Sequence, residues 1–157
     1  MLAAGKGGSR EQQDVVINLG ITQTIPEAYV SDGTVRLDLY ARLLRARDQQ
    51  ALDELEDEFD DRFGQLPEEV SKLIRLARLR IAANGNGVSR IDAGPRGLAL
   101  SFAVKPSRKR IDAMLQVCQG EYRDERLVFK LSTENGLQRL SNLENILRQT
   151  PSSQSVN

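Results

Sequence analysis

The chain has 157 residues, of which 39% are hydrophobic and 28% charged, which is ordinary for one soluble globular domain with or without tails. Lys and Arg number 22, and Asp and Glu also number 22, so the chain lacks the basic excess of a dedicated nucleic-acid-binding domain. With no His and a single Cys, Cys118, the sequence excludes a Cys/His zinc site, a Ser-His-Asp or Cys-His relay and an internal disulfide.

The first residues, MLAAGKGGSREQQD, are rich in Gly, Ser, Gln and charge. We expect residues 1–14 to form a linker or a disordered terminus. Gly7 follows Lys6 where a phosphate-binding loop has Ser or Thr, so we expect no nucleotide site there. The segment also lacks the apolar core of a signal peptide, and no apolar run in the chain approaches the roughly 20 residues of a membrane span. We therefore expect a cytoplasmic protein.

A β-branched run at residues 15–21 predicts a short strand, and Pro26 and Asp32-Gly33 mark turns before the first helix. That helix is predicted over TVRLDLYARLLRAR, residues 34–47, with Ser31 or Asp32 as its cap. The spacing i, i+3, i+4, i+7 predicts an inward face made of Leu37, Tyr40, Ala41 and Leu44.

The second predicted helix, QQALDELEDEFDDRF, is strongly acidic. Asp48 is its expected cap, and its apolar stripe consists of Leu52, Leu55, Phe59 and Phe63. The other faces carry seven carboxylates and one Arg: Asp53, Glu54, Glu56, Asp57, Glu58, Asp60, Asp61 and Arg62. A solvated face and a binding surface both fit this pattern. Acid–base chemistry fits less well, because it needs carboxylates with separated pKa values in a pocket, and no calcium-binding loop is present.

Gly64 is expected to end the second helix in a left-handed conformation, and Pro67 belongs in the first turn of a third helix. Glu68 and Glu69 favour the positive end of that helix. Its stripe is Val70, Leu73, Ile74, Ala77 and Ile81, and its predicted outer face holds Lys72, Arg75, Arg78 and Arg80. The glycines of NGNG, residues 84–87, stop it.

The pattern then changes to short strands. Strands are predicted at residues 88–94 and 98–104, the latter with Leu98, Leu100, Phe102 and Val104 on one face. A helix over residues 107–120 follows, with Ile111, Met114, Leu115 and Cys118 inward; then a strand over residues 126–132. The last helix has Leu137, Leu140, Leu143 and either Ile146 or Leu147 inward, before a polar tail at residues 151–157.

These elements predict an α+β or α/β fold, in which a block of three helices precedes a small mixed sheet with β-β-α-β-α order. The basic cluster PSRKR, residues 106–110, fits a solvated helix terminus better than a phosphate contact, because no aromatic side chain is interleaved with it. The residues predict no catalytic constellation, no metal site and no cofactor.

One long segment, Arg36 to Ile91, resembles the C-terminal domain of the bacterial transcription-repair coupling factor family, Mfd. The family pattern begins with Arg-Leu, a Tyr and a second Arg-Leu pair, here Arg36, Leu37, Tyr40, Arg42 and Leu43. It continues with Asp-Arg-Phe-Gly and Leu-Pro, here residues 61–64 and 66–67, and with Ala-Arg-Leu-Arg, here residues 77–80. A weaker match extends the resemblance to residues 15–150, which we expect to form a single domain.

The resemblance implies a non-catalytic regulatory domain of a much larger protein. Members of the family are ATP-dependent DNA translocases that remove stalled RNA polymerase from damaged DNA and recruit UvrA for nucleotide-excision repair. Their motor motifs are absent here, so the chain is expected to be a C-terminal fragment or a short paralogue, and DNA contacts are expected from the parent's motor domains. The last domain of the family packs on an N-terminal UvrB-like module of the same protein, masks its UvrA-binding surface and restrains the motor until polymerase is engaged.

By position, the acidic residues of the masking contact correspond to Glu58 and Asp61. Glu54 lies four residues before Glu58, so the three carboxylates are expected to share one helix face and to meet an arginine-bearing partner. Arg62 either pairs with Glu58 or joins the partner contact. Lysine at positions 58 and 61 is expected to expose the UvrA site and to leave the domain's melting temperature nearly unchanged. The alternative function is a nucleic-acid-binding module that uses the Arg- and Lys-rich helix faces.

Overall fold

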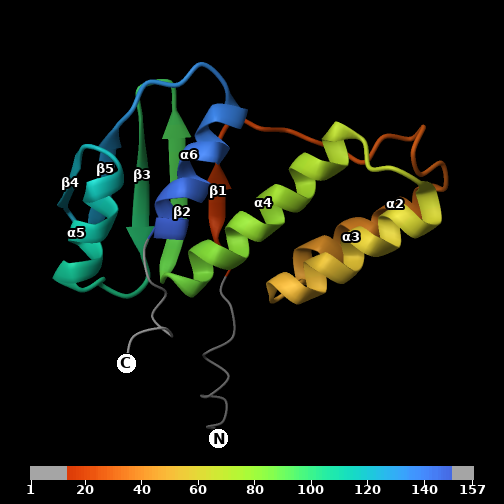
Figure 1. Cartoon of the computed structure of the whole chain (residues 1–157), viewed down its shortest axis with the longest axis horizontal. Coiled ribbons are helices and arrows are strands. Elements are labelled where there is room, and N and C mark those ends of the chain that lie inside the picture. The colour runs from red at the N-terminus through yellow and green to blue at the C-terminus, as the bar shows by residue number, and fades with distance from the viewer. Residues whose placement is uncertain (1–13, 150–157) are drawn as a thin grey trace, which may run out of the picture. The chain divides into compact units, whose positions relative to one another are not determined.

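The computed structural model describes residues 14–149, and these fall into two compact units (Figure 1). One unit comprises residues 21–81, and the other combines the segment up to Gly20 with the chain from Ala82 onward. Residues 1–13 and 150–157 lie outside the described residues, and so do nearly all of the predicted N-terminal linker and the whole polar tail. In the described part of the chain, no helix is both long and apolar enough to cross a membrane.

The first unit is helical. It consists of α2 (Gly33–Arg45), α3 (Gln49–Phe63) and most of α4 (Glu68–Gly85). Asp32 caps α2 by accepting hydrogen bonds from the amides of Thr34 and Val35, and Asp48 caps α3 by accepting one from Ala51. Both caps satisfy amides that the first helical turn leaves unpaired, as the sequence predicts.

The core of the helical unit is aliphatic, with one buried aromatic ring. The predicted stripe of α3 is correct, since Leu52, Leu55 and Phe59 are buried and Phe63 packs against them at the edge. The predicted stripe of α4 is also correct, since three of its members are buried and the other two, Leu73 and Ile81, pack against the core while partly exposed. The fully buried members from the rest of the unit are Ile25, Val30, Leu39, Leu43, Ala46, Val70, Ile74 and Ala77.

The predicted inward face of α2 is wrong for Leu37 and Leu44, whereas Tyr40 packs against the core as predicted. Leu39 and Leu43 are buried, whereas Leu37 is 70% and Leu44 is 71% exposed. The helix has leucines on two faces, so its periodicity allows either face to be the buried one. Packing against α3 and α4 determines which face is buried. The true core face runs through Val35, Leu39, Leu43 and Ala46.

The arginines of α4 were predicted to face outward, and the structure corrects this. Arg80 donates to the carbonyl oxygens of Leu43 and Ala46 at 3.1 and 3.3 Å, so it caps the C-terminal end of α2. Arg78 lies against α3. Long cationic side chains thus join α4 to its neighbours, their stems covering apolar surface.

The second unit is a five-stranded sheet with two helices. Its strands are β1 (Val16–Asn18), β2 (Val88–Gly94), β3 (Gly97–Phe102), β4 (Gly120–Arg123) and β5 (Arg126–Lys130), in the order β1-β2-β3-β5-β4. β1 pairs parallel with β2 and all other pairs are antiparallel. The helices α5 (Arg108–Val117) and α6 (Gly136–Gln149) lie against one face of the sheet (Figure 1). The α+β fold with a mixed sheet is therefore confirmed.

The sheet unit holds one strand that the sequence did not predict. β4 pairs with β5 through a tight turn in which Asp124 and Glu125 both have positive φ, 55° and 64°. Tight hairpin turns with positive φ usually contain Asn-Gly or Asp-Gly. The Asp-Glu sequence found here does not predict such a turn. Val104, predicted to lie on the same strand face as Leu98 and Leu100, is instead beyond the end of β3 and 70% exposed. Leu137, predicted to face inward, is 37% exposed.

Candidate protein-interaction surface

An ion-pair network joins α2 to α3. Arg42 donates through Nη1 and Nη2 to the two carboxylate oxygens of Glu58, at 2.8 and 2.6 Å. Arg62 adds a third bond to the same carboxylate at 2.8 Å. The parallel pair from Arg42 is the fork geometry that fixes orientation as well as distance.

This network changes the acidity of Glu58. The side chain is 30% exposed, and the hydrogen bonds from Arg42 and then Arg62 lower its pKa from 4.5 to about 2, although partial burial acts in the opposite direction. Glu58 is therefore ionised throughout the neutral range. A carboxylate offers roughly four lone-pair sites, and three are used inside this chain.

The predicted site residues separate into two groups. The pairing of Arg62 with Glu58 is confirmed, whereas Arg42 was not assigned this role. Arg42 and Glu58 are sixteen residues apart on different helices, so only tertiary structure brings them together. Glu54 and Asp61 are exposed, and Glu54 accepts a 3.3 Å hydrogen bond from Gln50.

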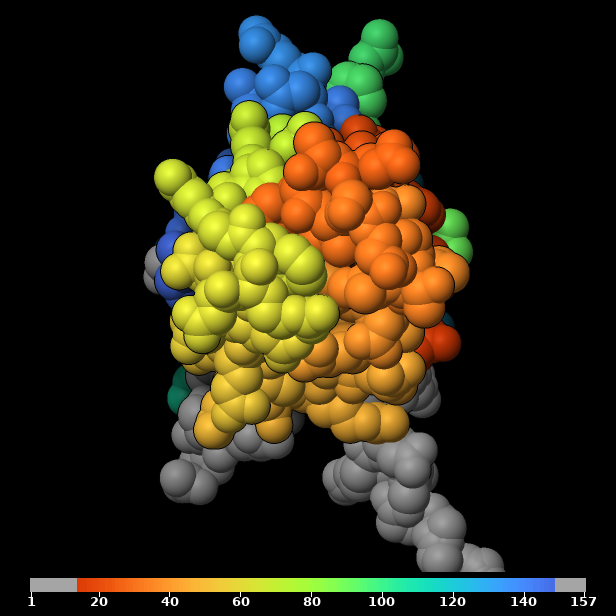
Figure 2. Space-filling view, turned by 90° about the vertical axis from the view of Figure 1, so that its right-hand side faces the viewer, coloured from red at the N-terminus to blue at the C-terminus, as the bar shows by residue number. Residues whose placement is uncertain are grey.

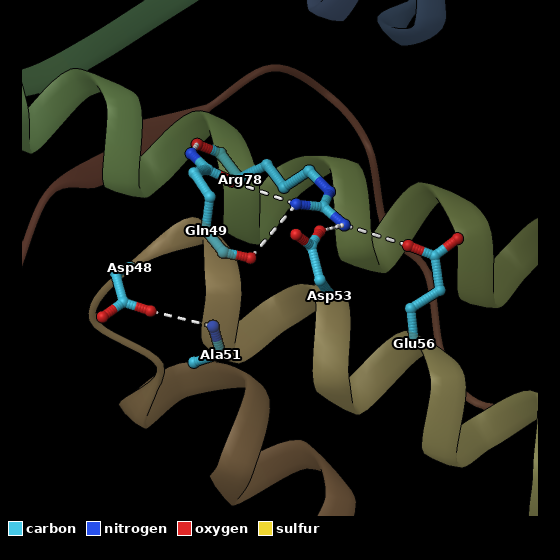
Figure 3. Close-up of polar contacts among 6 residues, drawn as sticks. All are labelled: Asp48, Gln49, Ala51, Asp53, Glu56 and Arg78. Carbon is cyan, nitrogen blue, oxygen red and sulfur yellow. Dashed lines mark hydrogen bonds and ion pairs between the residues drawn. The ribbon is translucent and has the colours of Figure 1, made fainter.

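A second network ties the opposite flank of α3 to α4 (Figure 3). Arg78 Nη2 lies 2.8 Å from Asp53 Oδ1 and 2.9 Å from Glu56 Oε1. Its Nη1 donates to Gln49 Oε1 at 3.2 Å, and Gln49 Nε2 donates back to the Arg78 carbonyl oxygen. Glu58 on one flank of α3, and Asp53 and Glu56 on the other, are thus paired with arginines of the helical unit.

The outward row of α3 differs from both flanks. Glu54, Asp57 and Asp61 recur at spacings of three and four, so they share one face, and all three are exposed. Among residues 14–149, neither Asp57 nor Asp61 forms a hydrogen bond or an ion pair. Asp57 was not among the predicted site residues, although its spacing from Glu54 and Asp61 was visible in the sequence. Glu54, Asp57 and Asp61 are called the acidic row below.

The end of the acidic row is fixed by an aromatic cluster. The Tyr29 hydroxyl lies 2.7 Å from the Gly64 carbonyl oxygen and 3.1 Å from that of Phe59. The Tyr29 ring packs 5.6 Å from the ring of Phe63, and the Arg62 guanidinium lies 4.9 Å from the Phe63 centroid. In Figure 2 the segment before α2 (orange) and the α3–α4 turn (yellow) adjoin on this surface.

Gly64 ends α3 as predicted, but the predicted left-handed conformation is wrong. Gly64 has φ of 94° and ψ of −171°, a positive φ that suits glycine but lies outside the left-handed helical region. Pro67 precedes α4 and accepts the hydrogen bond of Ser71.

The basic residues of the cluster at residues 106–110 have different environments. Ser107 caps α5 by accepting from the Arg110 amide at 3.2 Å. Arg110 Nη2 donates to the Asn86 carbonyl and side-chain oxygens, at 2.6 and 3.0 Å, so it is used inside the sheet unit. Lys109 and Arg108 remain exposed.

The described residues contain no group of three or more Cys, Asp or Glu side chains arranged to hold a metal ion. The candidate site consists of exposed carboxylates on one face of α3. Carboxylates accept hydrogen bonds from cationic groups, and Arg can meet a carboxylate through two parallel bonds.

Comparisons with known proteins identify the family. The family model described as the TRCF domain matches residues 19–113. The transcription-repair-coupling factor of Haemophilus influenzae is 36% identical over 110 residues, which cover 70% of this chain and 10% of that protein. The Escherichia coli factor is 32% identical over 107 residues, 66% of this chain and 9% of that protein.

A solved structure supports the same fold. The crystal structure of the C-terminal domain of a transcription-repair coupling factor aligns with a TM-score of 0.74 over 88% of this chain and 95% of that chain, at 19% identity. This chain spans about a tenth of the length of the curated relatives named above. The predicted resemblance to the C-terminal domain of the transcription-repair coupling factor, Mfd, is confirmed, and the chain belongs to the TRCF domain family.

Proposed function

We propose that this domain is a non-catalytic regulatory and protein-interaction domain of a transcription-repair coupling factor. It contacts the N-terminal UvrB-like module of its parent protein, masks the UvrA-binding surface there and restrains the ATP-dependent DNA translocase until RNA polymerase is engaged. Its links to UvrA and RNA polymerase are indirect, and contacts with DNA belong to the parent's motor domains.

The observation that carries the proposal is the contrast between the flanks and the outward row of α3. Arg42 pairs with Glu58, and Arg78 pairs with Asp53 and Glu56, so the two arginines join α3 to both neighbouring helices. The acidic row, Glu54, Asp57 and Asp61, is left exposed. A rigid helix that presents several uncompensated carboxylates suits arginine-bearing partners, and exposed pairs of about 0–1 kcal/mol each release easily, as a reversible restraint requires.

The roles of the four predicted contact residues follow from their geometry. Asp61 and Glu54 are available for the partner's arginines. Glu58 can accept about one further hydrogen bond. It therefore contributes less directly to the partner contact and mainly holds α3 against α2. Arg62, bound to Glu58 and stacked near Phe63, positions the end of the row.

The test uses the complete coupling factor that carries this domain. Asp61→Lys should raise UvrA binding and basal ATPase, because repulsion of the partner's arginines opens the masked state. The melting temperature of the domain should stay within about 1 °C, as expected for an exposed substitution without a partner. Glu134→Lys, an equally exposed reversal in the sheet unit, is the matched control. Unchanged UvrA binding in Asp61→Lys would refute the masking role.

The alternative function, nucleic-acid binding through Arg- and Lys-rich helix faces, has less support. Arg78 and Arg80 of α4 are bound within the helical unit, and Arg110 is bound to Asn86. The exposed part of the cluster at residues 106–110 lacks aromatic side chains on which bases stack. DNA affinity that fell steeply with salt would favour this alternative, and we expect a flat response in filter binding.

A further inference from the structure

The solvent-facing side of α2 carries three apolar residues in a row. Leu37, Ala41 and Leu44 lie at i, i+4 and i+7, so they follow one another along one side of the helix. Leu37 is 70% and Leu44 is 71% exposed, and the small Ala41 between them is partly exposed. Single exposed leucines are common on protein surfaces, but these three residues form a continuous stripe, which is called the α2 ridge below.

Two charged residues border the α2 ridge on one flank. Asp38 and Arg45 each follow one of its leucines, and seven residues make almost two helical turns, so the two side chains lie on the same flank about 10 Å apart along the axis. Both are exposed, and among residues 14–149 neither forms an ion pair. Arg42 lies between them, but its guanidinium is bound to Glu58. The flank therefore presents one anion and one cation.

This arrangement is complementary to a reversed copy of itself. If two α2 helices pack antiparallel about a two-fold axis near Ala41, Leu37 of each copy meets Leu44 of the other, and Asp38 of each copy meets Arg45 of the other. Such a contact is isologous, because both copies use the same surface. The small side chain of Ala41 at the axis allows the helices to approach closely.

The charges also select against other arrangements. Two parallel copies in register would place Asp38 opposite Asp38 and Arg45 opposite Arg45, and like charges that face each other are unfavourable. A partner surface of a single charge sign would meet a like charge at one end of the flank. A second, antiparallel copy satisfies both ends.

We propose that the α2 ridge is an interface through which two copies of this domain associate, with their α2 helices antiparallel and with Asp38 of each copy paired with Arg45 of the other. The leucines supply the desolvated apolar centre, and the ion pairs fix register and direction. One helix face on each side buries less than the roughly 1,200 Å² of a standard interface, so the dimer is weak. The proposal is independent of the masking function, because it uses α2 and not the acidic row of α3.

The experiment is sedimentation equilibrium of the whole chain from about 10 µM to about 1 mM, a range suited to weak association. The variants are Leu37→Ala/Leu44→Ala, Asp38→Arg and Arg45→Asp. Val104→Ala, which changes an equally exposed apolar side chain of the sheet unit, is the control. Circular dichroism melts check that each variant is folded, as expected for substitutions at exposed positions.

Wild type and Val104→Ala should shift from monomer to dimer over this range. The leucine variant should weaken the dimer by roughly tenfold or more. Each single charge variant should also weaken it, because like charges then face each other at both ends of the interface. An equimolar mixture of Asp38→Arg and Arg45→Asp should restore association, because each introduced charge then meets an unlike charge on the other chain.

Three outcomes would overturn the inference. The first is a chain that stays monomeric up to about 1 mM, including the case in which the parent's N-terminal module binds wild type but not the leucine variant, since the ridge would then contact a different partner. The second is a dimer that the leucine variant does not weaken. The third is a mixture of the two charge variants that associates no better than either variant alone, because the antiparallel pairing would then be wrong.

Discussion

Replacing Glu58 by Gln tests whether this carboxylate is part of the fold. Lowering its pKa from 4.5 to about 2 corresponds to at most about 3.5 kcal/mol at roughly 1.4 kcal/mol per pH unit. The side chain is 30% exposed, so solvent screening reduces this to about 1–2 kcal/mol. The melting temperature should therefore fall by about 2–8 °C at neutral pH, at roughly 2–4 °C per kcal/mol.

The lowered pKa of Glu58 determines the direction in which its contribution to stability changes with pH. Because folding lowers the pKa of Glu58, the stabilisation is complete above the unfolded value of 4.5 and is lost as the pH falls towards about 2. Thermal unfolding followed by circular dichroism from pH 7 down to pH 2 should show the wild-type advantage over Glu58→Gln shrinking in that window. Asp61→Asn, which removes an exposed carboxylate without an ion pair among the described residues, is the control, and its melting temperature at neutral pH should not fall below that of wild type.

Equal melting temperatures at neutral pH would refute the assignment of Glu58 to a stabilising network, and a difference that persisted at pH 2 would refute its electrostatic origin. The structure also revises the expectation that reversing both predicted carboxylates leaves stability unchanged. The expectation of unchanged stability applies to Asp61→Lys only. Glu58→Lys would place its own charge beside those of Arg42 and Arg62 and would remove the carboxylate to which Arg42 binds.

Two further predictions concern an ion-pair contact in the helical unit and a close backbone approach in the sheet unit. Arg78→Met keeps the apolar stem but removes the ion pairs to α3, which are part-buried and shared between two carboxylates; urea unfolding should show a loss of about 1–2 kcal/mol, and a loss below about 0.3 kcal/mol would contradict a stabilising contact. In the sheet unit, Gly97→Ala would place a Cβ 2.6 Å from the Phe129 carbonyl oxygen, whereas Gly85→Ala meets nothing within 4 Å. Thermal melts should therefore show Gly97→Ala losing at least about 2 kcal/mol and Gly85→Ala losing none.

The sequence predicts best where each helix has one apolar face. In α3 the contrast between leucines and carboxylates leaves a single solution, and the core residues Leu52, Leu55 and Phe59 agree with it. In α2, leucines on two faces make periodicity ambiguous, and the exposed Leu37 and Leu44 were assigned to the core. Periodicity cannot distinguish two equally apolar faces of a helix, because only contact with a second helix determines which face is buried.

The site was predictable to the extent that it depends on spacing along one helix. The row containing Glu54 and Asp61, and the i, i+4 pair of Arg62 with Glu58, follow from helical geometry. The partnership of Arg42 with Glu58 and that of Arg78 with Asp53 cross between helices. No local pattern encodes such pairs, so the sequence alone could not tell which carboxylates remain uncompensated.

The uncompensated carboxylates have an energetic consequence of their own. Asp57 has like charges at i−4 and i+4, namely Asp53 and Asp61, and such pairs destabilise a helix by about 0.2–0.5 kcal/mol each. Arg78 relieves Asp53, but no described residue relieves Asp57 or Asp61. Asp57→Asn should therefore leave the domain as stable as wild type or stabilise it by up to about 0.5 kcal/mol in urea unfolding. If the acidic row serves a partner, the same substitution should weaken binding of the parent's N-terminal module, since surfaces kept for binding are often suboptimal for folding. A variant that lost stability and kept its affinity would show that Asp57 serves the fold instead.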